Sequence, residues 1–262
     1  MMSCSQQPDR SVRHSTKIIT NLSIGVIALC SGNLYAKDDS QSTPWDIGIN
    51  TTYRQSPFID GKGVVGFSPT RLKHGNIRLQ GFALPLYRNA DLVPYVGIGL
   101  DEWDYKRGDS ATLQDMSELK RAINIRAGVT MPLHNAQLTT EVGKDVAGAH
   151  KGVHAKIRYS RYIELGKREV RPYLEAQWLS SDLTDYYVGV NSDEVNQNRP
   201  QYSADADIAL KVGVNYLQRL SEAFTLIGGV NLTHYGNEIN DSPIVENDLI
   251  WGANLGITYR WK

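Results

Sequence analysis

The chain ends in LIWGANLGITYRWK, Leu249 to Lys262, where apolar and polar or small residues alternate almost without interruption. A period of two is typical of a β-strand with one apolar face. Trp251 and Trp261 lie ten residues apart on that face, which is about 33 Å along a strand at roughly 3.3 Å per residue. At a tilt of about 40° the vertical span falls to about 25 Å, the height of the apolar band of an outer-membrane barrel. The spacing therefore predicts a membrane-spanning strand with a tryptophan near each membrane surface.

The same alternation recurs along the chain, and no helical period of comparable length competes with it. Most of the segments run 9 to 13 residues, longer than the roughly 5 to 6 residues of a typical strand in a soluble sandwich and close to the 9 to 11 of a membrane barrel. The sequence therefore predicts an all-β fold, an antiparallel transmembrane β-barrel. The further strand segments are 45–53, 63–73, 77–87, 93–104, 118–131, 136–145, 153–163, 173–179, 204–216 and 222–235.

The connections between these segments have two lengths. Tight turns are expected at 73–76, 87–91, 133–136, 165–169 and 220–223, and long polar loops at 105–117, 181–202 and 236–248. Short periplasmic turns and longer outer loops are typical of outer-membrane barrels, which have an even number of strands. Because the segments number 11, one strand is missing or misplaced near Lys73 and Tyr87, so we expect about 12 strands, with 10 as the alternative.

The amino terminus has the three parts of a secretory signal peptide. Basic residues precede an apolar run, Ile18 to Ser31, and Leu34 to Ala36 then offer a small residue for cleavage. We therefore expect a signal peptide over residues 1–36 and a single barrel domain over residues 37–262. The apolar run is too short for a helix that crosses a bilayer. Lipidation at Cys30 is the alternative, disfavoured because Leu29 is bulky where a small residue is needed.

Removal of the leader leaves a chain without cysteine, because Cys4 and Cys30 both precede residue 37. Disulfides, thiol catalysis and thiolate zinc sites are thereby excluded for the exported chain. Three of the 28 basic residues and one of the 28 acidic residues lie in the leader, so 25 basic and 27 acidic residues remain. A charge this close to balance gives no indication of nucleic-acid binding.

Aromatic residues near the ends of the apolar faces are expected to form the two girdles at the membrane surfaces. The predicted girdle residues are Trp45, Tyr53, Trp178, Tyr216, Trp251, Tyr259 and Trp261.

The strand faces opposite the apolar ones carry charges of both signs and should line the lumen. Opposed charges inside a barrel of about 12 strands would pair across the bore, which favours a closed lumen. The rival interpretation is a narrow polar channel for small solutes. The predicted lumen network is Arg78, Arg126, Glu141, Asp145, His154, Lys156, Arg158, Arg171, Glu175, Asp205, Asp207 and Lys211.

Signals for catalysis are weak. Asp145, His150 and His154 lie close enough in sequence to suggest a metal or acid–base site, but His150 lies in the glycine-rich stretch GAHKG and is expected to shape a loop. Ser180 and Ser181 lack the strand–turn–helix motif of a nucleophile elbow. We therefore predict no catalytic, cofactor or metal site.

Several loop motifs resemble the MipA/OmpV family of outer-membrane proteins. They are KDVAGAHKG (144–152), SSDLTDYYVGV (180–190), NRPQYSA (198–204) and DSPIVENDLIWGANLGITYRW (241–261), and the likeness covers nearly the whole exported chain. The resemblance implies an outer-membrane barrel of the Gram-negative envelope. It also implies a scaffold that joins a lytic murein transglycosylase to a penicillin-binding protein, and other members are linked to osmotic or antimicrobial stress. One departure is Lys262, which follows Trp261 where outer-membrane strands usually end on an aromatic residue.

Within these motifs, two clusters are expected either to order their long loops or to form a contact surface for a partner. The sequence leaves both interpretations open. Together with the resemblance, the residues favour a non-enzymatic scaffold or structural protein linked to peptidoglycan remodelling, with outer-membrane lipid, a murein hydrolase and a penicillin-binding protein as expected partners and a narrow solute channel as the alternative. The clustered loop residues are Tyr186, Tyr187, Gly189, Asp241, Ser242 and Pro243.

Overall fold

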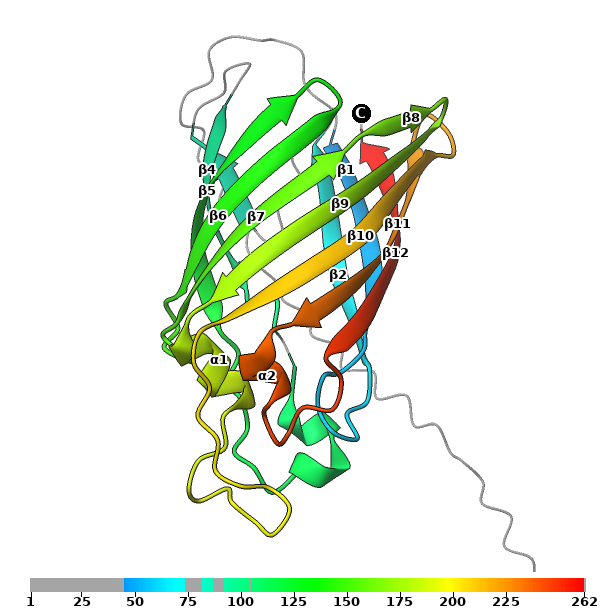
Figure 1. Ribbon diagram of the computed structural model, residues 1–262. Helices are drawn as coiled ribbons and strands as arrows, with labels where there is room; N and C mark the ends of the chain where they lie inside the picture. The colour runs from blue at the N-terminus through cyan, green and yellow to red at the C-terminus, as the bar shows by residue number, and fades with distance from the viewer. Residues whose placement is uncertain (1–44, 74–81, 87–91, 104, 262) are drawn as a thin grey trace, which may run out of the picture.

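A computed structural model describes residues 45–73, 82–86, 92–103 and 105–261. The leader expected over residues 1–36 and the first residues after it lie outside the described residues. The described strands form one antiparallel sheet that curls into a barrel-shaped wall (Figure 1). The all-β antiparallel barrel of about 12 strands predicted from the alternation is thus confirmed.

Twelve strands make up the sheet, and most of their bounds agree with the sequence segments to within a few residues. The largest differences are at β5, which begins at Ile123 rather than 118, and at β9, which begins at Arg168 rather than 173. The strands are β1 (Trp45–Arg54), β2 (Val64–Lys73), β3 (Phe82–Pro85), β4 (Val93–Leu100), β5 (Ile123–Leu133), β6 (Ala136–Asp145), β7 (Val153–Arg161), β8 (Ile163–Leu165), β9 (Arg168–Leu179), β10 (Asp207–Arg219), β11 (Phe224–Tyr235) and β12 (Leu249–Trp261).

Strands β7 and β8 are two parts of one interrupted strand. His154 pairs with Leu179 of β9 and Ile163 pairs with Val170 in the same continuous register. The interruption is at Tyr162, whose N–H donates instead to the carbonyl of Asn135. The path of paired strands is therefore β2-β1-β12-β11-β10-β9-β7-β6-β5-β4-β3.

The ends of this path, β2 and β3, follow one another in the sequence. Ten antiparallel steps separate them, so the two strands run in the same direction, and an antiparallel closure would need one further strand between them. The segment expected at 77–87 falls here. Its described part forms only β3, four residues long, and residues 74–81 and 87–91 lie outside the described residues.

The apolar face of the sheet points outward. Leu174 is 62% exposed and Leu255 is 57% exposed, whereas Glu175 and Thr258 on the opposite face are buried. Exposed side chains of this kind cover most strands, as expected of a wall in contact with lipid rather than water.

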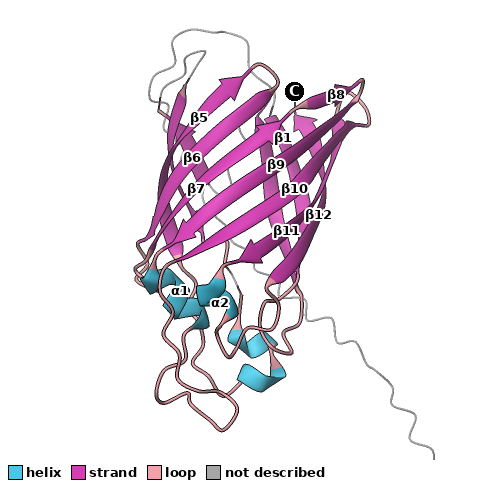
Figure 2. Ribbon diagram, viewed as in Figure 1, coloured by secondary structure: helices cyan, strands magenta, loops and turns pink. Residues whose placement is uncertain are grey.

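The two ends of the barrel differ strongly. At one end the turns are short, with two residues between β5 and β6 and two between β8 and β9. The long connections that the structure describes gather at the other end, together with the helices (Figure 2). Among the residues that the structure describes, no helix is long and apolar enough to cross a membrane. The helices are η1 (Arg107–Asp109), η2 (Ala111–Leu113), α1 (Ser181–Val188) and α2 (Asn237–Asn240).

Candidate functional site

Four connections pack together at the long-loop end of the barrel, and we call them the loop plug: the described residues of 55–63, 101–122, 180–206 and 236–248. They share one apolar core with inward-facing residues at the strand ends. Members from separate segments, such as Leu183, Val188, Ile239 and Ile244, are fully buried. The wall side of this core is Leu179, Ala209, Tyr235 and Ile250.

Aromatic rings occupy the centre of the loop plug. The Trp103 ring lies 4.7 Å from the ring of Tyr235 on the wall and 5.5 Å from that of Tyr187 on α1, measured between centroids. Tyr105 packs edge-on against both Trp103 and Phe58. Large rings at these distances bury much apolar area, and they tie three loops to the barrel wall.

A buried ion pair joins two segments of the loop plug. Arg107 Nη1 donates to Glu194 Oε1 at 3.1 Å, and both side chains are almost fully buried. The N–H groups of Ser117 and Asn191 also donate to the Glu194 carboxylate. Burial alone would raise the pKa of Glu194, but these donors and the guanidinium outweigh it, so the pKa lies below its usual range.

Two arginine side chains form further contacts between the plug segments 101–122 and 180–206. Arg107 Nη2 donates to the carbonyl of Gly189 at 2.9 Å, just after α1 ends. Arg199 binds Asp115 through both terminal nitrogens, at 3.0 and 2.6 Å, and its Nε donates to the carbonyl of Glu194. Bidentate contacts between arginine and a carboxylate fix the relative orientation of the two groups as well as pairing their charges. Segments 101–122 and 180–206 are therefore joined at several points.

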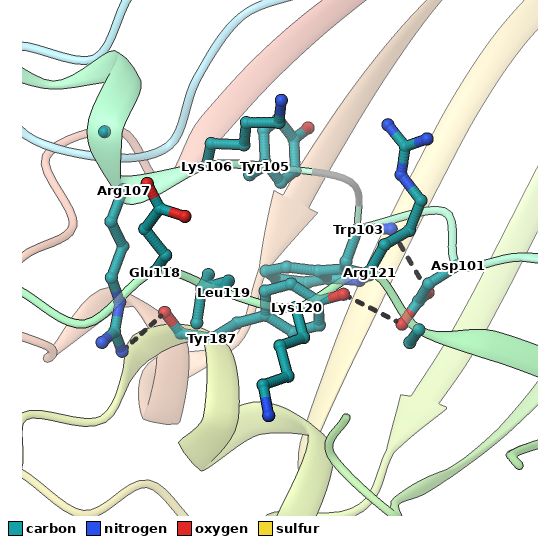
Figure 3. Close-up of a pocket in the computed structure, with 12 residues that line it drawn as sticks. Asp101, Trp103, Tyr105, Lys106, Arg107, Glu118, Leu119, Lys120, Arg121 and Tyr187 are labelled. Atoms are coloured by element: carbon teal, nitrogen blue, oxygen red, sulfur yellow. Dashed lines mark hydrogen bonds between the residues drawn. The ribbon is translucent and has the colours of Figure 1, made fainter. Parts of the chain in front are cut away.

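A cavity of about 300 Å³ lies between segment 101–122 and α1 (Figure 3). Its inner lining includes the buried side chains of Asp101, Trp103 and Tyr187, and its rim includes exposed Lys106 and Lys120. Glu118 also lines the cavity, so its rim carries charges of both signs.

Asp101 is the polar centre of the inner side. Its carboxylate lies 3.1 Å from His150 Nε2 and accepts from the Tyr187 hydroxyl at 3.2 Å. Gly152 N–H donates to His150 Nδ1, so Nε2 carries the proton in the neutral ring. His150 thus links the turn after β6 to the loop plug. No group of metal-binding side chains that could hold an ion occurs in the described part of the chain.

Deeper in the barrel, seven charges of alternating sign form a chain across the inner wall, which we call the lumen network. Each carboxylate in it lies within 4.0 Å of two cations. The shortest contacts are Arg158 Nε to Glu175 Oε2 at 2.6 Å and Lys156 Nζ to Glu102 Oε1 at 2.7 Å. The members in order are Arg126, Glu141, Lys156, Glu102, Lys211, Glu175 and Arg158.

Register explains most of these pairs. Lys156 lies directly opposite Glu141 on β6, and Glu175 lies opposite both Arg158 on β7 and Lys211 on β10. Opposite residues in antiparallel strands have their Cβ atoms about 4.5 to 5.5 Å apart, so charged side chains on one face meet directly.

Two tyrosines from the wall pack beside the lumen network against glycines of neighbouring strands. A Cβ built on Gly128 would lie 2.5 Å from the ring of Tyr95, and one on Gly213 would lie 2.6 Å from the ring of Tyr173. The Tyr95 hydroxyl donates to Glu141, and the Arg158 guanidinium stacks over Tyr173 at 4.5 Å. Because the two glycines have no side chain, the tyrosine rings fit beside them and contact members of the lumen network.

The sequence is similar to known proteins over most of its length. A sequence model of the family described as "MltA-interacting protein MipA" matches residues 24–261, nearly the whole chain. The chain belongs to the MipA family.

Two relatives of the chain are named as outer membrane proteins. Outer membrane protein Omp26La of Vibrio anguillarum is 23% identical over 157 residues, and outer membrane protein OmpV of Vibrio cholerae serotype O1 is 22% identical over 157 residues. Each alignment covers 60% of this chain and 61% of the relative, so the match spans less than two thirds of either relative. The resemblance to the MipA/OmpV family is confirmed, and this member is an outer-membrane protein.

Solved structures resemble the chain only weakly. Neisserial surface protein A is 7% identical with a TM-score of 0.25, over 83% of this chain and 97% of its own. A Pseudomonas aeruginosa FadL homologue is 7% identical with a TM-score of 0.34, over 83% of this chain and 90% of its own. The fold therefore rests on the strand pairing described above.

The structure brings most of the predicted lumen residues of this family member together. Arg126, Glu141, Lys156, Arg158, Glu175 and Lys211 are in the lumen network, and His154 Nε2 lies 3.9 Å from Glu141. Arg171 lies nearer the short turns, stacked over Tyr162 and paired with Glu169.

Three predicted lumen acids are placed elsewhere. Asp205 is exposed and precedes β10, because the strand begins at residue 207 rather than 204. Asp207 is buried at the mouth of the barrel, where it accepts from the N–H of Ile239. Asp145 ends β6, and its carboxylate accepts from the N–H groups of the following turn. Arg78 lies outside the described residues.

The family loop motifs lie mainly inside the loop plug. Tyr187, Gly189 and Ser242 are buried, and Ser242 Oγ donates to the carbonyl of Val188 at 2.6 Å. Tyr186 and Pro243 are half-buried, while Asp241 is exposed. The buried members of both clusters are thus part of the loop plug, while Asp241 and the half-buried Tyr186 and Pro243 keep part of each cluster at the surface.

Among the predicted girdle residues, Trp178, Trp251 and Tyr259 are exposed on the outward face. Tyr53 and Tyr216 are half-buried there, and the Tyr53 ring packs on that of Trp251 at 4.6 Å. The side chains of Trp45 and Trp261 lie outside the described set, although their backbones pair directly.

Sequence reasoning missed Glu102, Arg107 and Glu194. Glu102 falls within the strand segment expected at 93–104, but β4 ends at Leu100 and Glu102 belongs to the following loop. Arg107 and Glu194 lie in long loops, where no alternation indicates which way a side chain points. The cluster DEWD at the end of β4 was the one available signal for Glu102.

Proposed function

We propose that this outer-membrane protein is a non-enzymatic scaffold or structural protein of the cell envelope, linked to the peptidoglycan-remodelling machinery. The observation that carries this proposal is the loop plug, whose buried core fills the long-loop mouth of the barrel. A pore needs a continuous aqueous path, whereas a scaffold needs only a stable wall and exposed contact sites.

The proposed partners are a murein hydrolase and a penicillin-binding protein. The name of the family, MltA-interacting protein, supports the first. With the short turns in the periplasm, the contact surface would be the short-turn end, where the turns around Asn135, Lys167 and Glu222 are exposed.

Site-specific photo-crosslinking in cells tests this arrangement. A photoreactive residue at 135, 167 or 222 should capture a murein hydrolase, because these positions face the periplasm. Matched positions on the exposed loop plug, such as Asp193 and Asp205, should not. Capture from the loop plug alone would contradict the proposed orientation and contact surface.

A narrow channel for small solutes is the second candidate. One observation favours it: the Arg158 side chain faces inward yet remains 32% exposed, so solvent reaches the lumen network. Conductance of the purified protein in planar bilayers separates the two functions. We expect no unitary steps, and clean, reproducible steps would favour the channel.

We also propose that residues 1–36 are a cleaved leader, on the strength of the basic, apolar and small-residue regions of that segment. Amino-terminal sequencing of the membrane fraction should find Lys37 first. A chain that begins at a lipidated Cys30 would contradict this.

A further inference from the structure

The carboxylate of Glu102 has an unusual origin within the lumen network. The other six members are inward-facing residues of strands β5, β6, β7, β9 and β10, whereas Glu102 belongs to segment 101–122 of the loop plug. It reaches the wall between Lys156 and Lys211, at 2.7 and 3.3 Å. The wall and the carboxylate are thus contributed by two parts of the fold.

The charges of the strand residues alone show which kind of ligand the wall would attract without Glu102. Its strand residues carry four positive charges, on Arg126, Lys156, Arg158 and Lys211, and two negative ones, on Glu141 and Glu175. Ammonium groups held close together in a restricted space attract an anion, since each is only partly hydrated. Without Glu102 the strand wall is therefore a site with an excess of two positive charges.

Solvent can reach this site. The side chains of Glu102 and Lys211 are 18% and 19% exposed, and that of Lys156 is 11% exposed, although all face the interior. A small solute in the lumen can therefore approach the lysines.

We propose that Lys156 and Lys211 form a carboxylate-binding site in the lumen, and that Glu102 occupies this site as an internal ligand. The site takes a small carboxylate, and its occupation by Glu102 fastens segment 101–122 to the barrel wall. The backbone supports the same attachment, because Arg54 donates to the carbonyl of Glu102.

Chemical rescue by acetate tests the site in the full-length barrel. Glu102→Ala removes a methylene and a carboxylate, which together have the size and charge of acetate. Hydrogen exchange of peptides from 101–122, followed by mass spectrometry in detergent, measures how firmly the segment is held.

We expect exchange in 101–122 to become about tenfold faster in Glu102→Ala, because local opening then loses a charged attachment. Acetate should slow this exchange again with a saturable dose dependence, whereas chloride and neutral acetamide at equal concentration should not. Wild type should show no acetate effect, since its site is filled. Glu118→Ala removes an exposed carboxylate from the same segment and should change neither the exchange nor its response to acetate.

Two further variants make the outcome specific. Glu102→Gln fills the space without the charge, so acetate should not rescue it. Lys211→Gln added to Glu102→Ala should abolish the acetate effect, because one of the two binding cations is gone. Glu102→Ser leaves a similar space and replaces Glu102→Ala if that variant does not fold. Equal effects of acetate and chloride, or an unchanged exchange rate in Glu102→Ala and Glu102→Ser, would overturn the proposal.

Discussion

Glu175 lies directly opposite Arg158 across β7 and β9, and it is the only carboxylate of the lumen network that faces a cation on both neighbouring strands. Lys211 Nζ lies 3.2 Å from Glu175 Oε1, and the Glu175 side chain is 1% exposed. Glu175→Gln leaves both cations without their shared partner and should cost about 3 to 5 kcal/mol of unfolding free energy. Arg158→Gln should cost less, because Glu175 keeps Lys211. Denaturant titration in lipid measures both. Losses of at most about 1 kcal/mol in each, with altered ion selectivity, would favour the channel.

Arginine at the centre of the outward face should destabilise the barrel. Leu255 is 57% exposed and lies near the middle of the span between Trp251 and Trp261. Leu255→Arg should therefore cost about 2 to 4 kcal/mol in a refolded lipid-bound barrel. Asn254 on the opposite face hydrogen-bonds Asn50, so Asn254→Arg should cost much less. Equal losses would mean that the two faces have been assigned the wrong way round.

Acid should loosen the loop plug through Glu194. Its pKa is lowered in the folded protein, so its ionised form contributes stability above the unfolded value of about 4.3, and this contribution is lost as the pH falls through the lowered folded pKa. Hydrogen exchange in 101–122 and 189–200, compared at each pH with the rate of unprotected amides, should therefore lose protection below about pH 4.3. Glu194→Gln should remove this part of the pH dependence, whereas Asp193→Asn, at an exposed neighbour, should retain it. An identical pH response in wild type and Glu194→Gln would contradict the assignment.

A residue larger than glycine at position 213 should destabilise the barrel, because the ring of Tyr173 occupies the space beside it. Gly213→Ala places a Cβ 2.6 Å from that ring and should cost about 1 to 3 kcal/mol through overpacking. Gly228→Ala is the matched control, because its nearest contact is 3.5 Å away. In a Tyr173→Ala background, Gly213→Ala should cost less, because the ring that meets the new Cβ is absent. Additive losses in this cycle would show that the ring and the glycine do not interact.

The strands and their faces could be predicted from the sequence because alternation reports directly on side-chain direction. In β12, for example, the segment from Leu249 and its outward tryptophan at 251 both agree with the structure. In β7 and β9 the same reasoning placed Lys156, Arg158 and Glu175 inside, where cross-strand register then pairs them.

The candidate site was less accessible to prediction because its contacts join distant loops. Nothing in the sequence indicates that Glu102 reaches Lys211, or that Arg107 lies beside Glu194, since neither pair belongs to one ladder. Asp205 was misplaced for a related reason: its alternation continues beyond the point where β10 pairs with β9. Tyr187 was recognised as part of a motif, but its burial depends on packing with Trp103.

The pairing of the first described strand with the last has a consequence for the order of assembly. β1 pairs with β12 over ten residues, from Trp45 with Trp261 to Arg54 with Gly252, whereas β5 and β6 are joined by only two residues. Bringing distant segments together costs more chain entropy than closing a tight turn, and such contacts form slowly. Hairpins such as β5–β6 should therefore form early, and the β1–β12 ladder should form only after most of the chain has been released from its export pathway.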